Sequence, residues 1–219
     1  RNRPVASGAL PRSTALRIGA GLLIGSLSLS FLLSVSFGAV AFAYAALLVL
    51  YSVTLKHEVI LDVLTVAAGF VLRAVAGTVV IGVEISGWLL ICTILLALFL
   101  ALGKRRHELL ALEGVAVDHR PTLSEYSPAL LDQMIAVVTA SAVTAYALYT
   151  MSPETVGKFH TRWLPVTLPF VLYGVFRYLY LVHRRDLGSP METILTDRPL
   201  MAAVALWLLY NAFVIYRPH

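Results

Sequence analysis

Charged side chains are scarce in this sequence. Asp, Glu, Lys and Arg make up 13% of the 219 residues, whereas apolar residues make up 59%. A water-soluble domain of this size cannot bury so much apolar surface, so the composition indicates an integral membrane protein. Membrane-spanning segments are helices or closed barrels, because lipid offers the backbone no hydrogen bonds. The apolar runs here are much longer than the roughly 10-residue alternating strands of a barrel, which favours helices.

The sequence also has a single cysteine and no recognisable signal peptide at its start. Cys92 is the single cysteine and lies in an apolar run, which excludes an internal disulfide and a thiol metal cluster. The chain opens on Arg1, and its first 13 residues, "RNRPVASGALPRS", are polar and basic without the apolar core of a signal peptide. They resemble the middle of a loop, so we expect an N-terminal part of the protein to precede them.

Long apolar runs are abundant. About 20 such residues cross the hydrocarbon core of a bilayer. The sequence predicts seven spans, at about 14–35, 38–55, 59–81, 86–103, 128–150, 164–183 and 199–216. The predicted fold is therefore all-α: a polytopic transmembrane bundle that forms one membrane-embedded domain over residues 1–219.

The positive charges are unevenly divided between the connections. If the connections alternate across the membrane, one side carries twelve of the seventeen Lys and Arg residues and the other side carries three. The remaining two, Arg73 and Arg177, fall inside apolar runs. This asymmetry predicts that the basic side is cytoplasmic. The basic composition then reflects topology, and we predict no nucleic-acid partner.

The stretch "LFLALGKRRHELLALEG" places a basic cluster at the end of a span. Such a cluster is most often an anchor to anionic headgroups. Glu108 favours a second interpretation, because Mg²⁺ binds carboxylates and substrate phosphates together. Lys104 and Glu108 lie four residues apart, on one face of a helix, which is also the spacing of an ordinary surface ion pair. The pattern leaves the anchor and the metal–phosphate site open.

Two charges occur on one face of the run 59–81. Asp62 and Arg73 share this face with Gly69, and Arg73 lies about 16 Å further along the helix axis. A charge at that depth costs at least ~2.5 kcal/mol, so it should face a partner or a polar cavity. These residues either hold helices together or line a pocket entered from the basic side. Arg177 lies nearer the end of its run and is expected to extend to the interface.

Three motifs resemble the UbiA-type intramembrane prenyltransferases. "RNRPVASGALP" is similar to the end of their first conserved region, and "YSVTLKHEVILDVLTVAAGFVLRAVAG" to the connection between their fourth and fifth helices. "GKRRHELLALEG" stands at their second acidic motif, with Lys-Arg and a single Glu in place of Asp-rich sequence. Together with "FRYLYLVHRRDLGSPMETILTDRPL", this departure resembles one branch, the decaprenyl-phosphate phosphoribosyltransferases. The resemblance implies the last seven of nine helices, with the first Asp-rich motif upstream of Arg1.

The resemblance implies a transferase. Its reaction would move a 5-phosphoribosyl group from phosphoribosyl diphosphate to polyprenyl phosphate, with Mg²⁺, at the cytoplasmic face of the bacterial plasma membrane, for cell-wall polysaccharide precursors. Glu108 and Asp62 are the implied catalytic and metal-binding residues. The implied substrate-binding residues are Arg1, Arg3, Lys56, Arg73, Lys104, Arg105, Tyr126 and Arg198. Without the first Asp-rich motif, we expect this chain alone to be inactive.

Two other functions are alternatives to this one. A UbiA-type enzyme that transfers a prenyl group to an aromatic acceptor predicts an Asp-rich second motif, which this sequence lacks. A non-enzymatic transporter fragment predicts paired halves with broken segments at mid-membrane. The sequence has no internal repeat, and its charges gather at one surface. The sequence does not determine the oligomeric state, and a homo-oligomer is one of the alternatives.

Overall fold

Long apolar helices dominate the computed structural model, which describes residues 7, 11–111, 125–184 and 195–216. Seven of them are long and apolar enough to cross a membrane, which confirms the predicted spans and the all-α class. They are α1 (Arg12–Leu33), α2 (Val35–Val53), α3 (Leu61–Ile81), α4 (Gly87–Ala111), α5 (Pro128–Met151), α7 (Leu168–Arg184) and α9 (Arg198–Tyr216). The connections include the short helices η1 (Leu55–His57), α6 (Pro153–Phe159) and η4 (Leu164–Thr167).

The helix ends follow from local sequence. Ser34 and Ser127 precede α2 and α5, and each hydroxyl accepts a hydrogen bond from a backbone N–H of the first turn. Pro128, directly after Ser127, is suited to the first helical position. Proline has no backbone N–H, and an N–H at this position would have no acceptor within the helix. Gly82 ends α3 with a φ of 68°, a conformation that costs glycine little.

Helix α4 is longer than the sequence predicts. The predicted span ends at residue 103, but the helix continues to Ala111, so the charged stretch from Lys104 to Glu108 is helical. Lys, Arg, Glu and Leu all have high helix propensity, so the change from apolar to charged residues does not end the helix. The charged groups therefore have fixed positions on a helix instead of lying in a loop.

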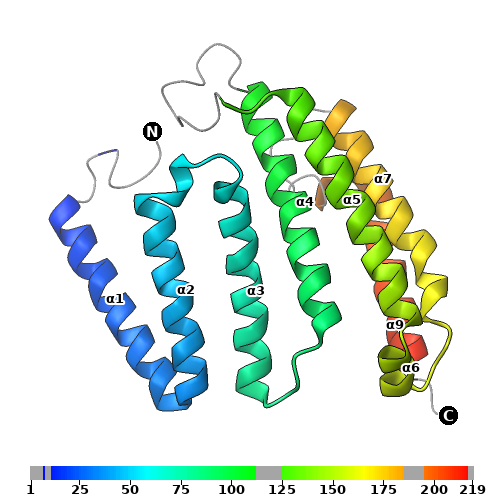
Figure 1. Cartoon of the computed structure of the whole chain (residues 1–219), viewed down its shortest axis with the longest axis horizontal. Helices are drawn as coiled ribbons and strands as arrows, with labels where there is room; N and C mark the ends of the chain where they lie inside the picture. Colours follow the sequence, from blue (N-terminus) through cyan, green and yellow to red (C-terminus); the bar gives the residue numbers. More distant parts are fainter. Residues whose placement is uncertain (1–6, 8–10, 112–124, 185–194, 217–219) are drawn as a thin grey trace.

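Consecutive helices lie side by side, so that α1 to α5 form a curved row and α7 and α9 follow at its far edge (Figure 1). The starts of α1, α3, α5 and α9 and the ends of α2, α4 and α7 lie at one end of the bundle. We call it the basic end, because it carries Lys56 and the cluster that begins at Lys104. The alternation expected from the charges is thus present in the helix directions.

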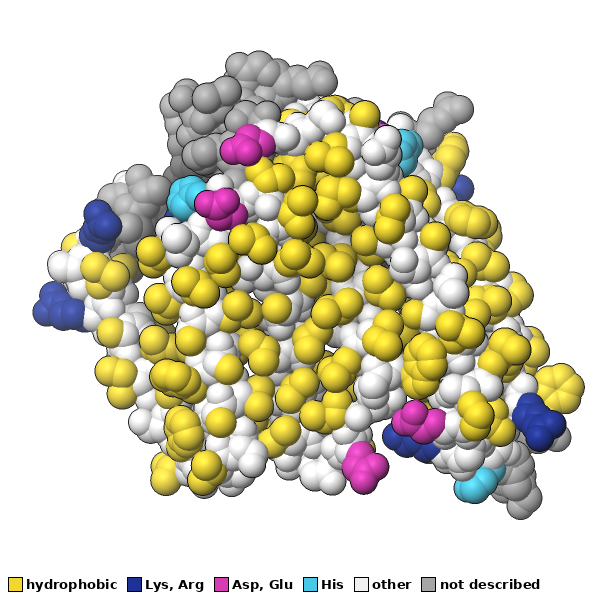
Figure 2. Space-filling view, in the orientation of Figure 1, with side chains coloured by type: hydrophobic (Ala, Val, Ile, Leu, Met, Phe, Trp, Pro, Cys, Tyr) yellow, Lys and Arg dark blue, Asp and Glu magenta, His cyan; other side chains and the backbone are white. Residues whose placement is uncertain are grey.

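Packing is densest toward the basic end. The core contains Val63, Leu102, Leu131 and Leu181, each at most 1% exposed, from α3, α4, α5 and α7. Elsewhere large apolar side chains face outward, as expected for helices in lipid. On the face in Figure 2, apolar side chains cover the middle and charged ones lie toward the two ends. The most buried part of the bundle therefore lies at the same end as the charged stretch of α4.

Candidate active site

A buried carboxylate lies at the centre of the charged residues of the basic end. Asp62, in the first turn of α3, is 0% exposed. Its Oδ2 accepts a hydrogen bond from Arg105 Nε at 2.8 Å, and its Oδ1 accepts one from the Tyr126 hydroxyl at 2.9 Å. A charge without water needs such partners, because desolvation otherwise costs several kcal/mol. Asp62 thereby links α3 to α4 and to Tyr126, two residues before the start of α5.

Arg105 extends this network toward solvent. Its side chain is 6% exposed, and its Nη1 donates to Glu108 Oε2 one turn later on α4. The Glu108 side chain is 29% exposed, and its Oε1 lies 4.0 Å from Nζ of the more exposed Lys104. We call Asp62, Lys104, Arg105, Glu108 and Tyr126 the Arg105 cluster. Its inner end, at Asp62 and Tyr126, is buried. Its outer end presents the Glu108 carboxylate beside the Lys104 ammonium group.

Tyr126 fixes the backbone where α3 begins. Its hydroxyl accepts a hydrogen bond from the N–H of Ile60 at 2.7 Å. Ile60 has a φ of 70° and a ψ of −45°, close to the rare, strained γ-turn and unfavourable for a β-branched residue. Burial is the main reason why the pKa of Tyr126 is raised to about 12; the hydrogen bond from Ile60 lowers this pKa, and the hydrogen bond to Asp62 raises it. The phenol therefore stays protonated near neutral pH and keeps donating to Asp62.

A second ion pair fastens α4 to α5. Arg106 Nε donates to Asp132 Oδ1 at 2.6 Å, and His183 Nε2 of α7 lies 3.3 Å from the same oxygen. The sequence analysis did not single out Asp132. Its only signal is its position on the first turns of an apolar helix, which does not indicate the partner.

A third ion pair joins α7 to α9. Arg177 donates to both carboxylate oxygens of Asp197, at 3.1 and 2.8 Å, and Asp197 Oδ1 also accepts the N–H of Leu200. Arg177 therefore has a buried carboxylate partner in addition to its place near the helix end. Asp197 directly precedes α9 and was also not found from the sequence, although an Asp before an apolar run is a usual helix-capping signal.

The structure brings together five of the ten residues implied by the resemblance, namely the members of the Arg105 cluster. Lys56 in η1 and Arg198 at the start of α9 lie at the same end of the bundle. Arg1 and Arg3 lie outside the described residues. Their assignments to substrate stay predictions.

Arg73 has a different environment. It is exposed on α3, and its guanidinium carbon lies 4.2 Å from the ring centroid of Phe70 and 5.6 Å from that of Tyr44. Cation–π contacts of this kind contribute about 0.5–2 kcal/mol. Among the described residues, its neighbours are thus aromatic rings. Its predicted place in a substrate pocket stays a prediction.

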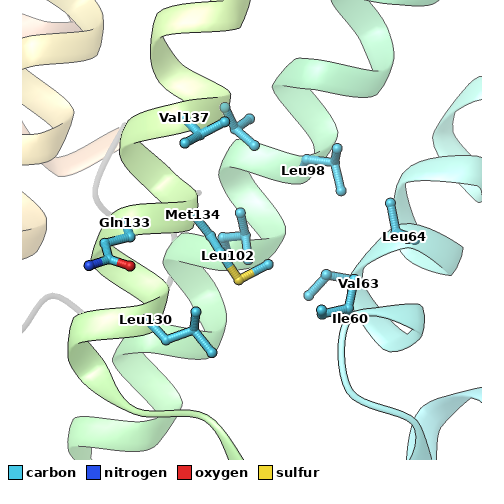
Figure 3. A pocket seen from close by; sticks show the side chains of 10 residues that line it. Ile60, Val63, Leu64, Leu98, Leu102, Leu130, Gln133, Met134 and Val137 are labelled. Atoms are coloured by element: carbon cyan, nitrogen blue, oxygen red, sulfur yellow. The ribbon is translucent and has the colours of Figure 1, made fainter.

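An apolar groove of about 420 Å³ lies between α3, α4 and α5 (Figure 3). Gln133 is its one polar lining residue, and the others are Ile60, Val63, Leu64, Leu98, Leu102, Leu130, Met134, Val137 and Val138. Ile60 also belongs to the hydrogen-bond network of Tyr126. The groove therefore adjoins the Arg105 cluster.

The described residues hold no group of three or more His, Cys, Asp or Glu side chains placed to bind a metal ion. Both oxygens of Asp62 already accept hydrogen bonds, whereas Glu108 is partly exposed. Mg²⁺ commonly takes one or two carboxylates, substrate phosphates and waters. Glu108 fits that pattern as a single protein ligand. Asp62 fits it only if its hydrogen bonds with Arg105 and Tyr126 break.

The family to which this architecture belongs follows from sequence comparison. Residues 1–209 match the model of the UbiA prenyltransferase family. The chain belongs to the UbiA prenyltransferase family. This assignment confirms the resemblance drawn from the motifs and the expectation of a transferase-type membrane protein. The charged stretch of α4 and the Arg105 cluster are thus features of a UbiA-family chain.

Several relatives carry one name. The chain is similar to the decaprenyl-phosphate phosphoribosyltransferase of Corynebacterium glutamicum, with 32% identity over 99% of this chain and 66% of the relative. The protein of that name from Mycolicibacterium smegmatis is 30% identical over 95% of the chain and 67% of its own length. The Mycobacterium tuberculosis protein of that name is 27% identical over 95% of the chain and 68% of its own length. The chain thus spans about two thirds of the length of these relatives.

Proposed function

We propose that this UbiA-family protein transfers a 5-phosphoribosyl group from phosphoribosyl diphosphate to a polyprenyl phosphate. The names of its relatives support this substrate pair. One structural observation carries the choice of a catalytic site over a membrane anchor: the Arg105 side chain is 6% exposed and bound to a buried carboxylate. An anchor acts through cations that reach the headgroups, and a buried Arg–Asp pair contributes nothing to that.

The exposed end of the cluster contacts the polar substrate. Lys104 provides an exposed ammonium group for the diphosphate, and Glu108 provides the carboxylate for a metal. Arg105 holds Glu108 in place, and Asp62 and Tyr126 hold Arg105. We therefore assign Asp62 to positioning rather than to metal binding. Arg1, Arg3, Lys56 and Arg198 are further candidates for phosphate contacts.

The UbiA family is generally dependent on a divalent metal, and we propose Mg²⁺ for this member. Glu108 is the described residue that would hold it. When bound, the metal supplies charge neutralisation for the leaving diphosphate.

The reaction joins two anions, and the chain must bring them together. A phosphate oxygen of the lipid attacks the anomeric carbon of the ribose, and the bond from that carbon to the diphosphate breaks. Lys104 offsets the negative charge that gathers on the leaving group, and the ordered cluster keeps this cation aligned with the site. Burial of Arg105 and Asp62 keeps water from competing for their hydrogen bonds.

The two substrates meet at one surface of the membrane. Phosphoribosyl diphosphate is soluble, whereas the head of a polyprenyl phosphate lies at the interface. We place this reaction at the basic end of the bundle, on the cytoplasmic face of a bacterial plasma membrane. The lipid-linked product would serve cell-envelope polysaccharide synthesis.

A second candidate is transfer of a prenyl group from a prenyl diphosphate, which the family as a whole favours. The single Glu108 in "GKRRHE", where Asp-rich sequence would be expected, argues against it. Both candidates use a diphosphate leaving group, so the acceptor and donor must be tested directly.

The test uses membranes from cells that express the complete gene. They receive polyprenyl phosphate, Mg²⁺ and radiolabelled phosphoribosyl diphosphate, and label is measured in the organic-extractable lipid. We expect label in the lipid that depends on the polyprenyl phosphate. Absence of this label, with prenyl transfer to an aromatic acceptor in a parallel sample, would replace the proposal by the second candidate.

A further inference from the structure

We propose that Asp132 is a positioning residue for the transfer reaction, an inference that rests on the proposed function. Asp132 binds Arg106, which directly follows Arg105 on α4. Through this contact Asp132 fixes the rotation of α4 about its own axis, and with it the places of Arg105 and Glu108.

Arg105 and Arg106 bind carboxylates of two different helices. Arg105 Nε donates to Asp62 of α3, and Arg106 Nε donates to Asp132 of α5. Successive residues of an α-helix point about 100° apart, so the two contacts hold α4 from different directions. A single contact restrains one direction only, whereas two contacts in different directions restrain the rotation of the helix.

The geometry of the pair between Arg106 and Asp132 suits a positioning role. The Arg106 side chain is 11% exposed, and its guanidinium contacts both carboxylate oxygens: Oδ1 through Nε at 2.6 Å and Oδ2 through Nη2 at 3.5 Å. A planar guanidinium that meets a carboxylate at two points has a defined orientation. On the α7 side, Arg106 Nη1 donates to the Val182 carbonyl oxygen at 3.5 Å, and His183 Nε2 lies 3.3 Å from Asp132 Oδ1. The pair therefore joins α4, α5 and α7 at one place.

The contacts around α4 form a closed series, which we call the contact ring. The first contact joins Asp62 of α3 to Arg105 of α4. The second joins Arg106, the next residue of α4, to Asp132 of α5. Tyr126, six residues before Asp132 in the chain, donates back to Asp62 and closes the ring. Because the ring is closed, a shift of Asp132 changes the geometry of the Arg105 cluster.

A close contact with α7 limits the other movements of α4. Gly103 lies three residues before Arg106, and a Cβ atom there would come within 2.8 Å of the Tyr178 hydroxyl oxygen. The aromatic ring of Tyr178 also packs on that of Phe99, with centroids 4.9 Å apart. Since α4 cannot move closer to α7 at this point, rotation is the movement that the ion pair must restrain.

The first experiment compares two interhelical ion pairs at the basic end. Asp132→Asn weakens the pair with Arg106, and the matched control Asp197→Asn weakens the pair that joins α7 to α9. A purely structural role predicts the same kcat per folded molecule for both variants. We expect kcat to fall at least about tenfold in Asp132→Asn alone, with KM for phosphoribosyl diphosphate nearly unchanged, because small misplacements of catalytic groups slow a reaction strongly. Equal kcat values in the two variants would overturn the proposal.

The second experiment needs no turnover. Substitutions at distant sites usually have additive effects on stability, whereas substitutions within one network do not. The melting temperature of the complete protein in detergent is measured for Asp62→Asn combined with Asp132→Asn, for Asp62→Asn combined with Asp197→Asn, and for the three single variants. We expect the first combination to lose clearly less than the sum of its single losses, and the second to lose the sum.

Additive losses in both combinations would contradict the contact ring. The two experiments also separate this inference from the proposed function. If the wild type transfers no label, the proposed function fails, and the melting temperatures still decide whether Asp132 acts on the Arg105 cluster.

Discussion

At the scale of single residues, the site depends on a carboxylate that water does not reach. Asp62 holds Arg105, which in turn holds Glu108, while Tyr126 occupies the second oxygen of Asp62. Removing one member of a buried ion pair leaves the other charge uncompensated. Asp62 is therefore expected to matter for stability and activity together, whereas Lys104, which is exposed, should matter for activity alone.

Substitution of Asp62 tests this dependence. We expect Asp62→Ala to lower the free energy of unfolding by about 3–5 kcal/mol, because it strands the Arg105 guanidinium in the protein interior. Thermal unfolding in detergent measures the change, with Lys104→Ala as the control that should leave stability almost unchanged. Equal melting temperatures for the two variants would contradict the buried pair.

Tyr126 gives the site a pH dependence at high pH. Its ordinary pKa of 10.0 rises to about 12 in the folded protein, so folding favours the protonated phenol. Its stabilising contribution is therefore complete below about pH 10 and is lost as the pH rises toward and through 12. We expect Tyr126→Phe to cost about 1 kcal/mol near neutral pH, a difference that vanishes across this window. Melting curves of both proteins from pH 8 to 12 measure it, and a difference that grows with pH would refute it.

The members of the site were predictable from sequence, but their partners were not. Lys104 and Glu108 are neighbours by helix spacing alone, and the structure gives this pair. Arg105 and Asp62 are 43 residues apart, so only the packing of α4 against α3 brings them together. Asp132 and Asp197 escaped notice for the same reason, because their partners lie on other helices.

At the scale of helices, spans are easier to predict than their ends. Length and apolarity identify the seven spans, since bilayer thickness sets both. The extension of α4 to Ala111 was not predicted, because a change in polarity marks the membrane boundary and does not mark the end of a helix. This extension is what places Arg105 and Glu108 on a rigid element.

Asp197 is expected to control how α9 begins. Its carboxylate accepts the N–H of Leu200 and pairs with Arg177, so Asp197→Ala removes a helix cap and a charge partner. We expect a loss of about 1–2 kcal/mol for the cap, and a further loss for the ion pair. Asp197→Asn keeps the capping oxygen and should lose only the second part. Unfolding measurements that give the same loss for both variants would show that the cap contributes nothing.

At the scale of the whole molecule, packing and charge are concentrated at one end. The core residues and the three ion-pair networks lie toward the basic end, while the outward faces along the membrane are apolar. This difference between the two ends of the bundle agrees with a molecule that works at one surface of the membrane. The charge asymmetry of the sequence predicts which surface that is, namely the cytoplasmic one.

Orientation can be measured by thiol labelling in a Cys92→Ser background. Lys158 on α6 and His57 in η1 lie at opposite ends of the bundle, and both are exposed. We expect a membrane-impermeant maleimide to label Lys158→Cys in intact cells and His57→Cys only after permeabilisation. The reverse pattern would place the basic end outside the cell.

The most direct test of the central claim concerns Glu108. Membranes with matched amounts of wild type, Glu108→Gln and the distant control Lys158→Ala are compared for transfer of labelled ribose 5-phosphate to polyprenyl phosphate. The account predicts transfer by the wild type and the control, and a loss of at least about 100-fold in Glu108→Gln with normal membrane insertion. Transfer at the wild-type rate in Glu108→Gln would contradict it, and would leave the charged stretch of α4 as an anchor.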